Sequence, residues 1–162
     1  FALGTAGTAV AMWRRAPGRG VALALATMVG FLPVAGDGMT TFARARSAAT
    51  VIDALARRVA PDHVVAHEGP LENTGSLLVR IPGPVRVVDG LQSNLAFGAT
   101  FADARALFWD SPRLQAAWTG PRRVFLVSGV DPGRSVVRAL PADRVHVIAH
   151  SGGRWLYSNV AD

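Results

Sequence analysis

The sequence contains no cysteine and no lysine, and both absences limit what the protein can do. Without cysteine there is no disulfide framework, no thiolate nucleophile and no zinc site built on sulfur ligands. All 17 basic residues are therefore arginines, and 11 acidic residues leave a net charge of +6. Only 17% of the residues are charged and 50% are hydrophobic, which excludes disorder as the main state.

Charge is scarcest near the start of the sequence. Residues 1–13 and 21–36 are uncharged, and three arginines cluster between them. A membrane helix needs about 20 apolar residues, with a lower limit near 17. We therefore expect two membrane spans within residues 1–39, joined by a basic loop at 13–20. Buried core helices and a targeting segment are the alternatives.

The arginines predict an orientation in the membrane. The loop 13–20 holds three arginines and no acid, which is typical of a cytoplasmic loop, so the rest of the chain would lie in the periplasm of a bacterium. An amphipathic helix is predicted over residues 40–60, because its apolar residues recur at steps of three and four before Pro61. The arginines expected to contact anionic headgroups at the membrane surface are Arg44, Arg46, Arg57 and Arg58.

Residues 61–162 predict an α/β domain, in which short apolar runs alternate with helical or turn-rich segments. Gly152 and Gly153 form the expected turn of a closing hairpin, and Ser111 is the expected N-cap of a helix. The predicted fold is two N-terminal transmembrane helices, then a small, mostly parallel sheet with flanking helices and a C-terminal antiparallel hairpin. The expected strands are residues 63–67, 85–88, 123–128, 145–149 and 154–158.

Polar residues gather where the predicted parallel strands end. In open α/β sheets, ligands bind beyond the carboxyl ends of the strands, so these residues are candidates for a binding crevice. The alternative is that strand ends are polar because turns need such residues. The candidate ligand-binding residues are His67, Glu68, Asp89, Asn94 and Ser128.

The histidines do not predict a metal site. His63 and His67 are four residues apart on one strand, as are His146 and His150 on another, which separates each pair by about 13 Å. Only His67 and His150 could meet, at adjacent strand ends. No phosphate-binding loop or nucleophile elbow occurs, and scattered arginines without interleaved aromatic residues predict no nucleic-acid partner.

Several short stretches of the sequence carry a resemblance to a known family. They are Leu78-Val79-Arg80, Pro84-Val85-Arg86-Val87-Val88, Leu95-Ala96-Phe97-Gly98, the run 122–128, and 146–157 with its terminal Tyr157-Ser158-Asn159. Through them, the segment from Asp62 to Gly98, and more broadly about residues 21–159, resembles the C-terminal part of bacterial polytopic membrane glycosyltransferases (GT-C) of the aminoarabinose-transferase and protein-mannosyltransferase type.

The resemblance implies an inner-membrane enzyme that transfers a sugar from a polyprenyl-phosphate donor to a lipid, protein or glycan acceptor at the periplasmic face. The catalytic carboxylate of that family is expected in an early periplasmic loop. The sequence begins with Phe1, so we expect it to be a fragment without that loop, and inactive alone. No catalytic residue or cofactor is assigned within it, and a divalent metal is a candidate cofactor of the whole enzyme.

Two other functions compete with this interpretation. One is a membrane-anchored, non-catalytic periplasmic binding module. The other is a small hydrolase or metal enzyme that uses His67, Glu68, Asp89 and His150 in the strand-end crevice.

Overall fold

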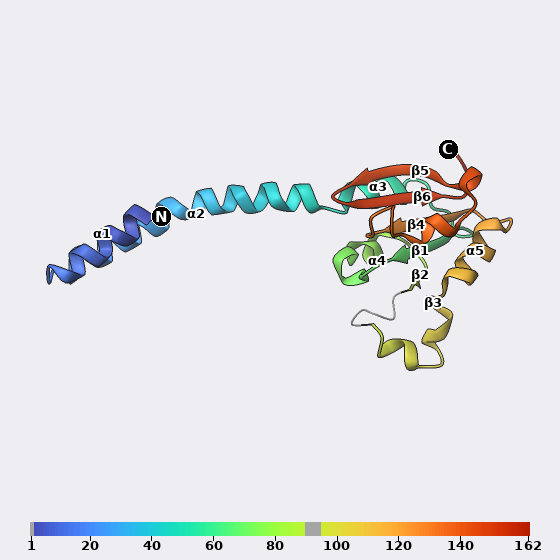
Figure 1. The fold of residues 1–162 in the computed structure, drawn as a ribbon, viewed down its shortest axis with the longest axis horizontal. Helices are drawn as coiled ribbons and strands as arrows, with labels where there is room; N and C mark the ends of the chain where they lie inside the picture. Colours follow the sequence, from blue (N-terminus) through green and yellow to red (C-terminus); the bar gives the residue numbers. More distant parts are fainter. Residues whose placement is uncertain (1, 90–94) are drawn as a thin grey trace. The chain divides into compact units, whose positions relative to one another are not determined.

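The computed structural model describes residues 2–89 and 95–162, which divide into two compact units, Phe1–Ala45 and Arg46–Asp162 (Figure 1). In the first unit, α1 (Ala2–Trp13) and α2 (Pro17–Arg46) are joined by a short turn in which Arg15 has a φ of 54°. The basic loop predicted over 13–20 thus forms this turn and the first residues of α2.

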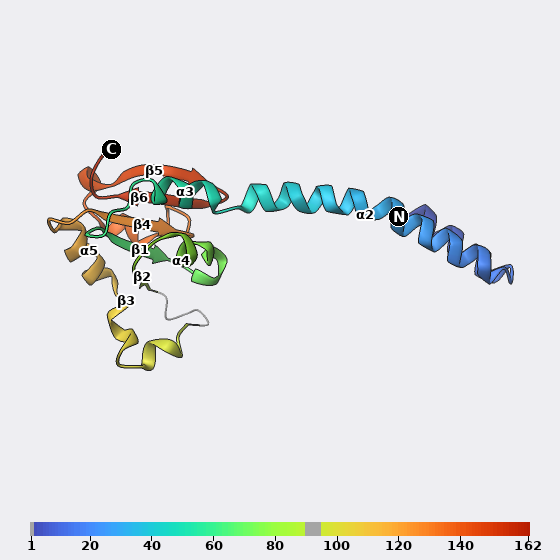
Figure 2. The same ribbon diagram turned by 180° about the vertical axis from the view of Figure 1, so that it is seen from behind.

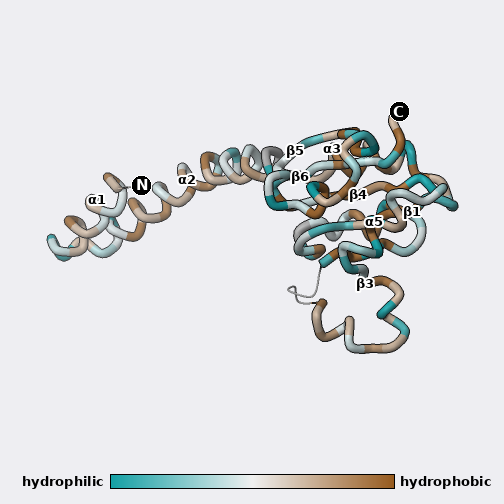
Figure 3. The backbone as a smooth tube through the Cα atoms, turned by 45° about the vertical axis from the view of Figure 1, so that its right-hand side comes forward, coloured by the Kyte–Doolittle hydropathy of each residue, from teal (hydrophilic) through white to brown (hydrophobic). Residues whose placement is uncertain are grey.

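Helix α2 contains the candidate membrane span. The most apolar 18 residues of Pro17–Ala43 have a mean hydropathy of 1.6, and only 6% of this stretch is buried, unlike a core helix of a soluble protein. Figure 3 shows hydrophobic residues recurring along both helices. Because α1 has 12 residues, it is shorter than the lower limit for a span. Among the described residues, one helix, α2, is long and apolar enough to cross a membrane. The prediction of two spans is therefore not confirmed.

Small residues let α1 approach the first half of α2. A Cβ atom added to Gly4 would lie 2.2 Å from Oγ1 of Thr27, and one added to Gly7 would lie 2.6 Å from Cδ2 of Leu23. Such close approach of helices at glycine is typical of membrane proteins, where packing takes the place of the hydrophobic effect.

The segment predicted as one helix over 40–60 is divided. It forms the end of α2 and all of α3 (Ala49–Ala56), with Ser47 and Ala48 between them. Oγ of Ser47 accepts a hydrogen bond from the backbone N–H of Ala49 at 3.1 Å. Since serine competes for backbone hydrogen bonds, it favours a helix end over a helix interior.

The second unit is built on a six-stranded mixed sheet in the order β3-β2-β1-β4-β6-β5. The first four strands are parallel, and β6 pairs antiparallel with both β4 and β5. This topology agrees with the predicted parallel sheet and closing hairpin. The strands are β1 (Val64–Glu68), β2 (Val85–Val88), β3 (Phe108–Trp109), β4 (Val124–Ser128), β5 (His146–Ser151) and β6 (Arg154–Ser158).

Helices cover both faces of this sheet, as the two opposite views show (Figures 1 and 2). One face packs Val65, Phe125 and Leu156 against α3 and the segment around α4 (Ser76–Arg80). The other packs Ala66 and Leu126 against α5 (Ser111–Thr119). Strands β1 and β4 are buried along their whole length, in agreement with the apolar runs Val64–Ala66 and Val124–Val127 with which they begin.

Two of the segments that connect the strands, Ala104–Ala106 and Val136–Ala139, are short 3₁₀ turns. The N-cap of α5 is Asp110 rather than Ser111, because the Asp110 carboxylate accepts the N–H of Arg113 at 2.9 Å. The 3₁₀ turns are η1 (Leu71–Thr74), η3 (Gly98–Thr100), η4 (Ala104–Ala106), η5 (Val136–Ala139) and η6 (Ala142–Arg144).

Candidate functional site

The parallel strands β1, β2 and β4 end side by side at one edge of the sheet. Glu68, the last residue of β1, is in register with Val88 on β2 and Ser128 on β4. The β5–β6 hairpin turns at the same edge, because Trp155 on β6 is in register with Ser128. The predicted strand-end residues of β1 and β4 are therefore neighbours, while their role in binding a ligand stays a prediction.

Glu68 is buried and accepts three hydrogen bonds. Its donors are Oγ of Ser128 at 2.6 Å, Oγ of Ser135 at 2.5 Å and the backbone N–H of Val136 at 2.8 Å. These bonds join β1 to β4 and to η5. The carboxylate is thus held within the fold on the α5 side of the sheet. Ser135 lies 67 residues from Glu68, and no sequence signal pointed to this contact.

Asp89 follows β2 in the left-handed region, with a φ of 50°. Its carboxylate is exposed and accepts a hydrogen bond from Oγ of Ser111 at 2.9 Å, which links β2 to the start of α5. Asn94 lies outside the described residues. Asp89 therefore lies at the predicted edge of the sheet, but it is not part of the hydrogen-bond network around Glu68.

His67 lies on the opposite face of β1 from Glu68. Its side chain is 1% exposed, and neither ring nitrogen has a hydrogen-bond partner among the described residues. Burial first, and then the nearby Arg154 cation, lower the pKa of His67 to about 4, against a smaller opposing effect of the Gly69 backbone. The imidazole is consequently neutral at physiological pH.

His67 and His150 do not meet. His67 is on β1 and His150 on β5, and β4 and β6 lie between these strands. Three strand spacings separate them by about 14 Å, so one ion cannot bind both. His150 instead stacks on Trp155 with a centroid distance of 3.8 Å. In the part of the chain that the structure describes, no three His, Asp or Glu residues are grouped to hold a metal ion.

A polar pocket of about 380 Å³ opens at this edge, on the His67 side. Its two cationic residues are Arg46 and Arg154, which sequence reasoning did not connect. Nη1 of Arg154 donates to the backbone oxygens of Arg46 at 2.8 Å and Gly152 at 2.9 Å. The pocket is lined by Arg46, Pro70, Thr74, Gly129, the hairpin residues Gly152 and Gly153, and Arg154.

The predicted membrane-facing arginines occupy different environments. The side chain of Arg44 lies outside what the structure describes, Arg46 lines the polar pocket, and Arg57 is exposed just after α3. Arg58 binds within the second unit: Nη1 donates to the Ala54 carbonyl at 3.0 Å. Contact of these residues with lipid headgroups stays a prediction.

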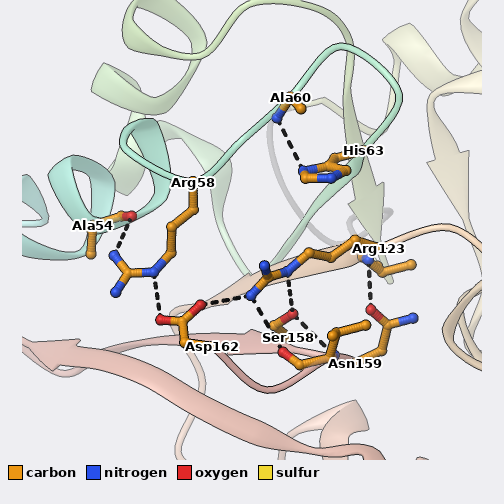
Figure 4. A network of polar contacts seen from close by, with 10 residues as sticks. Ala54, Arg58, Ala60, His63, Arg123, Ser158, Asn159 and Asp162 are labelled. Atoms are coloured by element: carbon orange, nitrogen blue, oxygen red, sulfur yellow. Dashed lines mark hydrogen bonds and ion pairs between the residues drawn. The ribbon is translucent and has the colours of Figure 1, made fainter.

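Arg58 belongs to a network that fixes the last described residues (Figure 4). Asp162 accepts Nε of Arg58 at 2.6 Å and Nη2 of Arg123 at 2.7 Å, and these hydrogen bonds hold the pKa of Asp162 below its ordinary value. Nearby, Oδ1 of Asn159 accepts the N–H of Val124 at 2.8 Å. The network ties the end of the sheet to the segment after α3.

Comparison with solved structures identifies a fold of the same kind. The chain is similar to ArnT from Cupriavidus metallidurans bound to undecaprenyl phosphate (TM-score 0.66, 24% identity). It is equally similar to ArnT from the same organism in the apo state (TM-score 0.67, 24% identity). Each match covers 98% of this chain and 28% of the ArnT chain. No family model and no curated protein matches the sequence.

The similarity confirms the predicted resemblance at the level of the fold. ArnT is an aminoarabinose transferase of the GT-C class, and nearly the whole chain shares the fold of a segment of it. The chain spans about 28% of the ArnT length. The similarity therefore shows a shared fold, and it does not show the activity of a whole transferase.

Proposed function

We propose that this chain is part of an integral membrane glycosyltransferase that takes a sugar from a polyprenyl-phosphate donor. The observation that carries the proposal is the fold similarity, which extends over 98% of the chain. The match therefore includes the apolar helix α2 as well as the sheet. One of the two ArnT structures is bound to undecaprenyl phosphate, a polyprenyl phosphate.

The acceptor is a lipid, protein or glycan at the periplasmic face of the bacterial inner membrane. The arginines of the α1–α2 turn support this orientation, since basic loops stay in the cytoplasm. In this arrangement α1 and α2 form a membrane hairpin, and the sheet unit lies on the periplasmic side. The sheet unit then shapes access of the acceptor or stabilises the membrane part.

The chemistry of transfer would come from residues outside this chain. Sugar transfer to an acceptor needs a carboxylate that activates the acceptor or holds a divalent metal. Within the described residues Glu68 is bound by three donors of the fold, which leaves it poorly suited to that task. The 162-residue chain should therefore be inactive alone.

The hydrolase or metal-enzyme alternative, which used His67, Glu68, Asp89 and His150, has little geometric support. His67 and Glu68 lie on opposite faces of β1, and His150 on β5 stacks on Trp155 with two strands between it and β1. The binding-module alternative keeps one supporting observation, the polar pocket at the sheet edge. A binding module would retain its ligand but would not change the pool of lipid-linked sugars.

A test in cells distinguishes transfer from binding. The reading frame that encodes this chain is deleted, and polyprenyl-phosphate sugars are quantified by mass spectrometry of extracted lipids. A glycosyltransferase predicts that a lipid-linked sugar accumulates and returns to its original level when the frame is restored. An unchanged pool of lipid-linked sugars in the deletion strain would contradict the proposal.

A further inference from the structure

The polar pocket at the sheet edge is lined by residues of positive charge. These are Arg46 and Arg154, and no Asp or Glu is among the described lining residues. The two hydrogen bonds of Nη1 to backbone oxygens fix Arg154 at the pocket wall. A guanidinium held in place offers a planar set of donors that suits oxyanions such as phosphate and carboxylate.

Thr74 adds a buried hydroxyl group to the pocket. Thr74 is 2% exposed, and its Oγ1 has no hydrogen-bond partner within the described residues. A buried hydroxyl without a partner is costly, and in native proteins such a group usually has a role. A ligand oxygen in the pocket would supply the partner that the protein does not.

The hairpin contributes backbone to the same pocket. Gly152 and Gly153 have φ values of 59° and 71°, which correspond to a type I′ turn. The hydrogen bond of such a turn joins its first and fourth residues, so the amides of the two glycines stay outside it. Added at Gly153, a Cβ atom would have no atom within 4 Å, which leaves the approach to this backbone open.

We propose that this pocket binds the phosphate group of a phosphate monoester or diester. Its candidate donors, the side chains of Arg46, Arg154 and Thr74, come from three separate segments, and a phosphate group has more oxygens to share among them than a carboxylate. The volume of about 380 Å³ leaves room for the group attached to the phosphate. Such a site does not depend on sugar transfer. The phosphate belongs either to a soluble phosphorylated compound or to a lipid headgroup.

The test is calorimetric titration of the 162-residue chain in dodecyl maltoside micelles and phosphate-free buffer. The probes are inorganic phosphate, phenyl phosphate and phosphatidic acid in mixed micelles, with sodium acetate as the carboxylate comparison. Saturable binding of phenyl phosphate would identify a soluble ligand. Binding of phosphatidic acid at least tenfold tighter than phenyl phosphate would identify a lipid headgroup.

Variants locate the binding. Arg154→Gln should weaken binding about tenfold or more, and Thr74→Val about threefold or more. Because Thr74→Val removes an unsatisfied hydroxyl, its thermal midpoint without ligand should equal or exceed that of the wild type. The matched control is Arg138→Gln, since Nη1 of Arg138 also donates to a glycine carbonyl, at 3.0 Å, but lies outside the pocket.

Three results would overturn the proposal. The first is no saturable binding of any phosphate probe. The second is binding of acetate as tight as that of inorganic phosphate. The third is phosphate binding that Thr74→Val and Arg46→Gln leave unchanged while both variants keep the wild-type circular dichroism spectrum. Arg46→Gln guards against a fold defect in Arg154→Gln, because the backbone oxygen of Arg46 still accepts the Arg154 bond.

Discussion

The carboxylate of Glu68 on β1 accepts the hydroxyl of Ser128 on β4 at 2.6 Å, across neighbouring strands and inside the fold. With Ser135 and Val136 as further donors, this acidic residue serves as an anchor of the sheet edge. A buried carboxylate that is fully hydrogen-bonded rigidifies its surroundings, and it is costly to alter.

Glu68→Gln should therefore lower the free energy of unfolding by about 2 kcal/mol or more, since hydrogen bonds to a charged acceptor become weaker and the amide NH₂ faces donors. Urea unfolding of the chain in detergent measures this loss. The control is Glu72→Gln, because Glu72 is exposed in η1. Equal stability of Glu68→Gln and the wild type would show that the network does not anchor the edge.

His67 predicts a dependence of stability on pH. Its pKa is about 4 in the folded protein and near 6.5 in the unfolded chain, so the unfolded state binds the extra proton between these values. The contribution is fully present above pH 6.5 and declines as the pH falls toward 4. From pH 7 to pH 5 the wild type should lose about 2 kcal/mol more than His67→Gln. Parallel unfolding curves for the two proteins over this range would refute the assignment.

The ion pairs of Asp162 should order the backbone that follows β6 at the end of the sheet. Asp162→Asn weakens the hydrogen bonds from Arg58 and Arg123, so amide hydrogen exchange after β6 should accelerate. Because the carboxylate is exposed, the effect should shrink in high salt. Asp143→Asn, an exposed acid in η6, is the control. Exchange after β6 that is the same in Asp162→Asn as in the wild type would mean that the ion pairs do not order this segment.

The α1–α2 hairpin can be tested by cross-linking, because the chain has no native cysteine. A Cβ atom added to Gly20 would lie 3.8 Å from that of Ala11, within the range for a disulfide. The double variant Ala11→Cys with Gly20→Cys should oxidise readily in detergent. Ala11→Cys with Gly30→Cys should not, since Gly30 has no atom within 4 Å of its added Cβ. Equal oxidation of the two double variants would argue against the hairpin.

The sequence pattern correctly predicted those strands and turns whose bounds depend only on neighbouring residues. Strand β2 and strand β6 have the predicted bounds, because β2 directly follows Pro84 and β6 directly follows the glycine turn. The two-residue Gly152-Gly153 turn likewise has the conformation that its sequence favours. The two residues of β3 were missed, since so short a strand forms only because β2 offers a free edge.

Long-range contacts explain what the sequence did not predict. Glu68 was selected correctly as a strand-end residue, but its partner Ser135 is brought to it by the crossover after β4. Arg154 reaches Arg46 across 108 positions, so the polar pocket has no signature in any single stretch of sequence. The suggested meeting of His67 and His150 failed because the hairpin inserts β6 beside β4 and moves β5 to the outer edge.

The most direct test of the proposed glycosyltransferase is sugar transfer by the full-length protein that contains this chain, reconstituted in liposomes. A radiolabelled sugar is supplied either on polyprenyl phosphate or on a nucleotide, with total bacterial envelope lipids and glycans as acceptors. A glycosyltransferase that uses a polyprenyl-phosphate donor should transfer label from polyprenyl phosphate and none from the nucleotide, and no transfer is expected when the 162-residue chain replaces the full-length protein. Transfer from the nucleotide alone, or label that stays entirely on polyprenyl phosphate, would contradict the proposal.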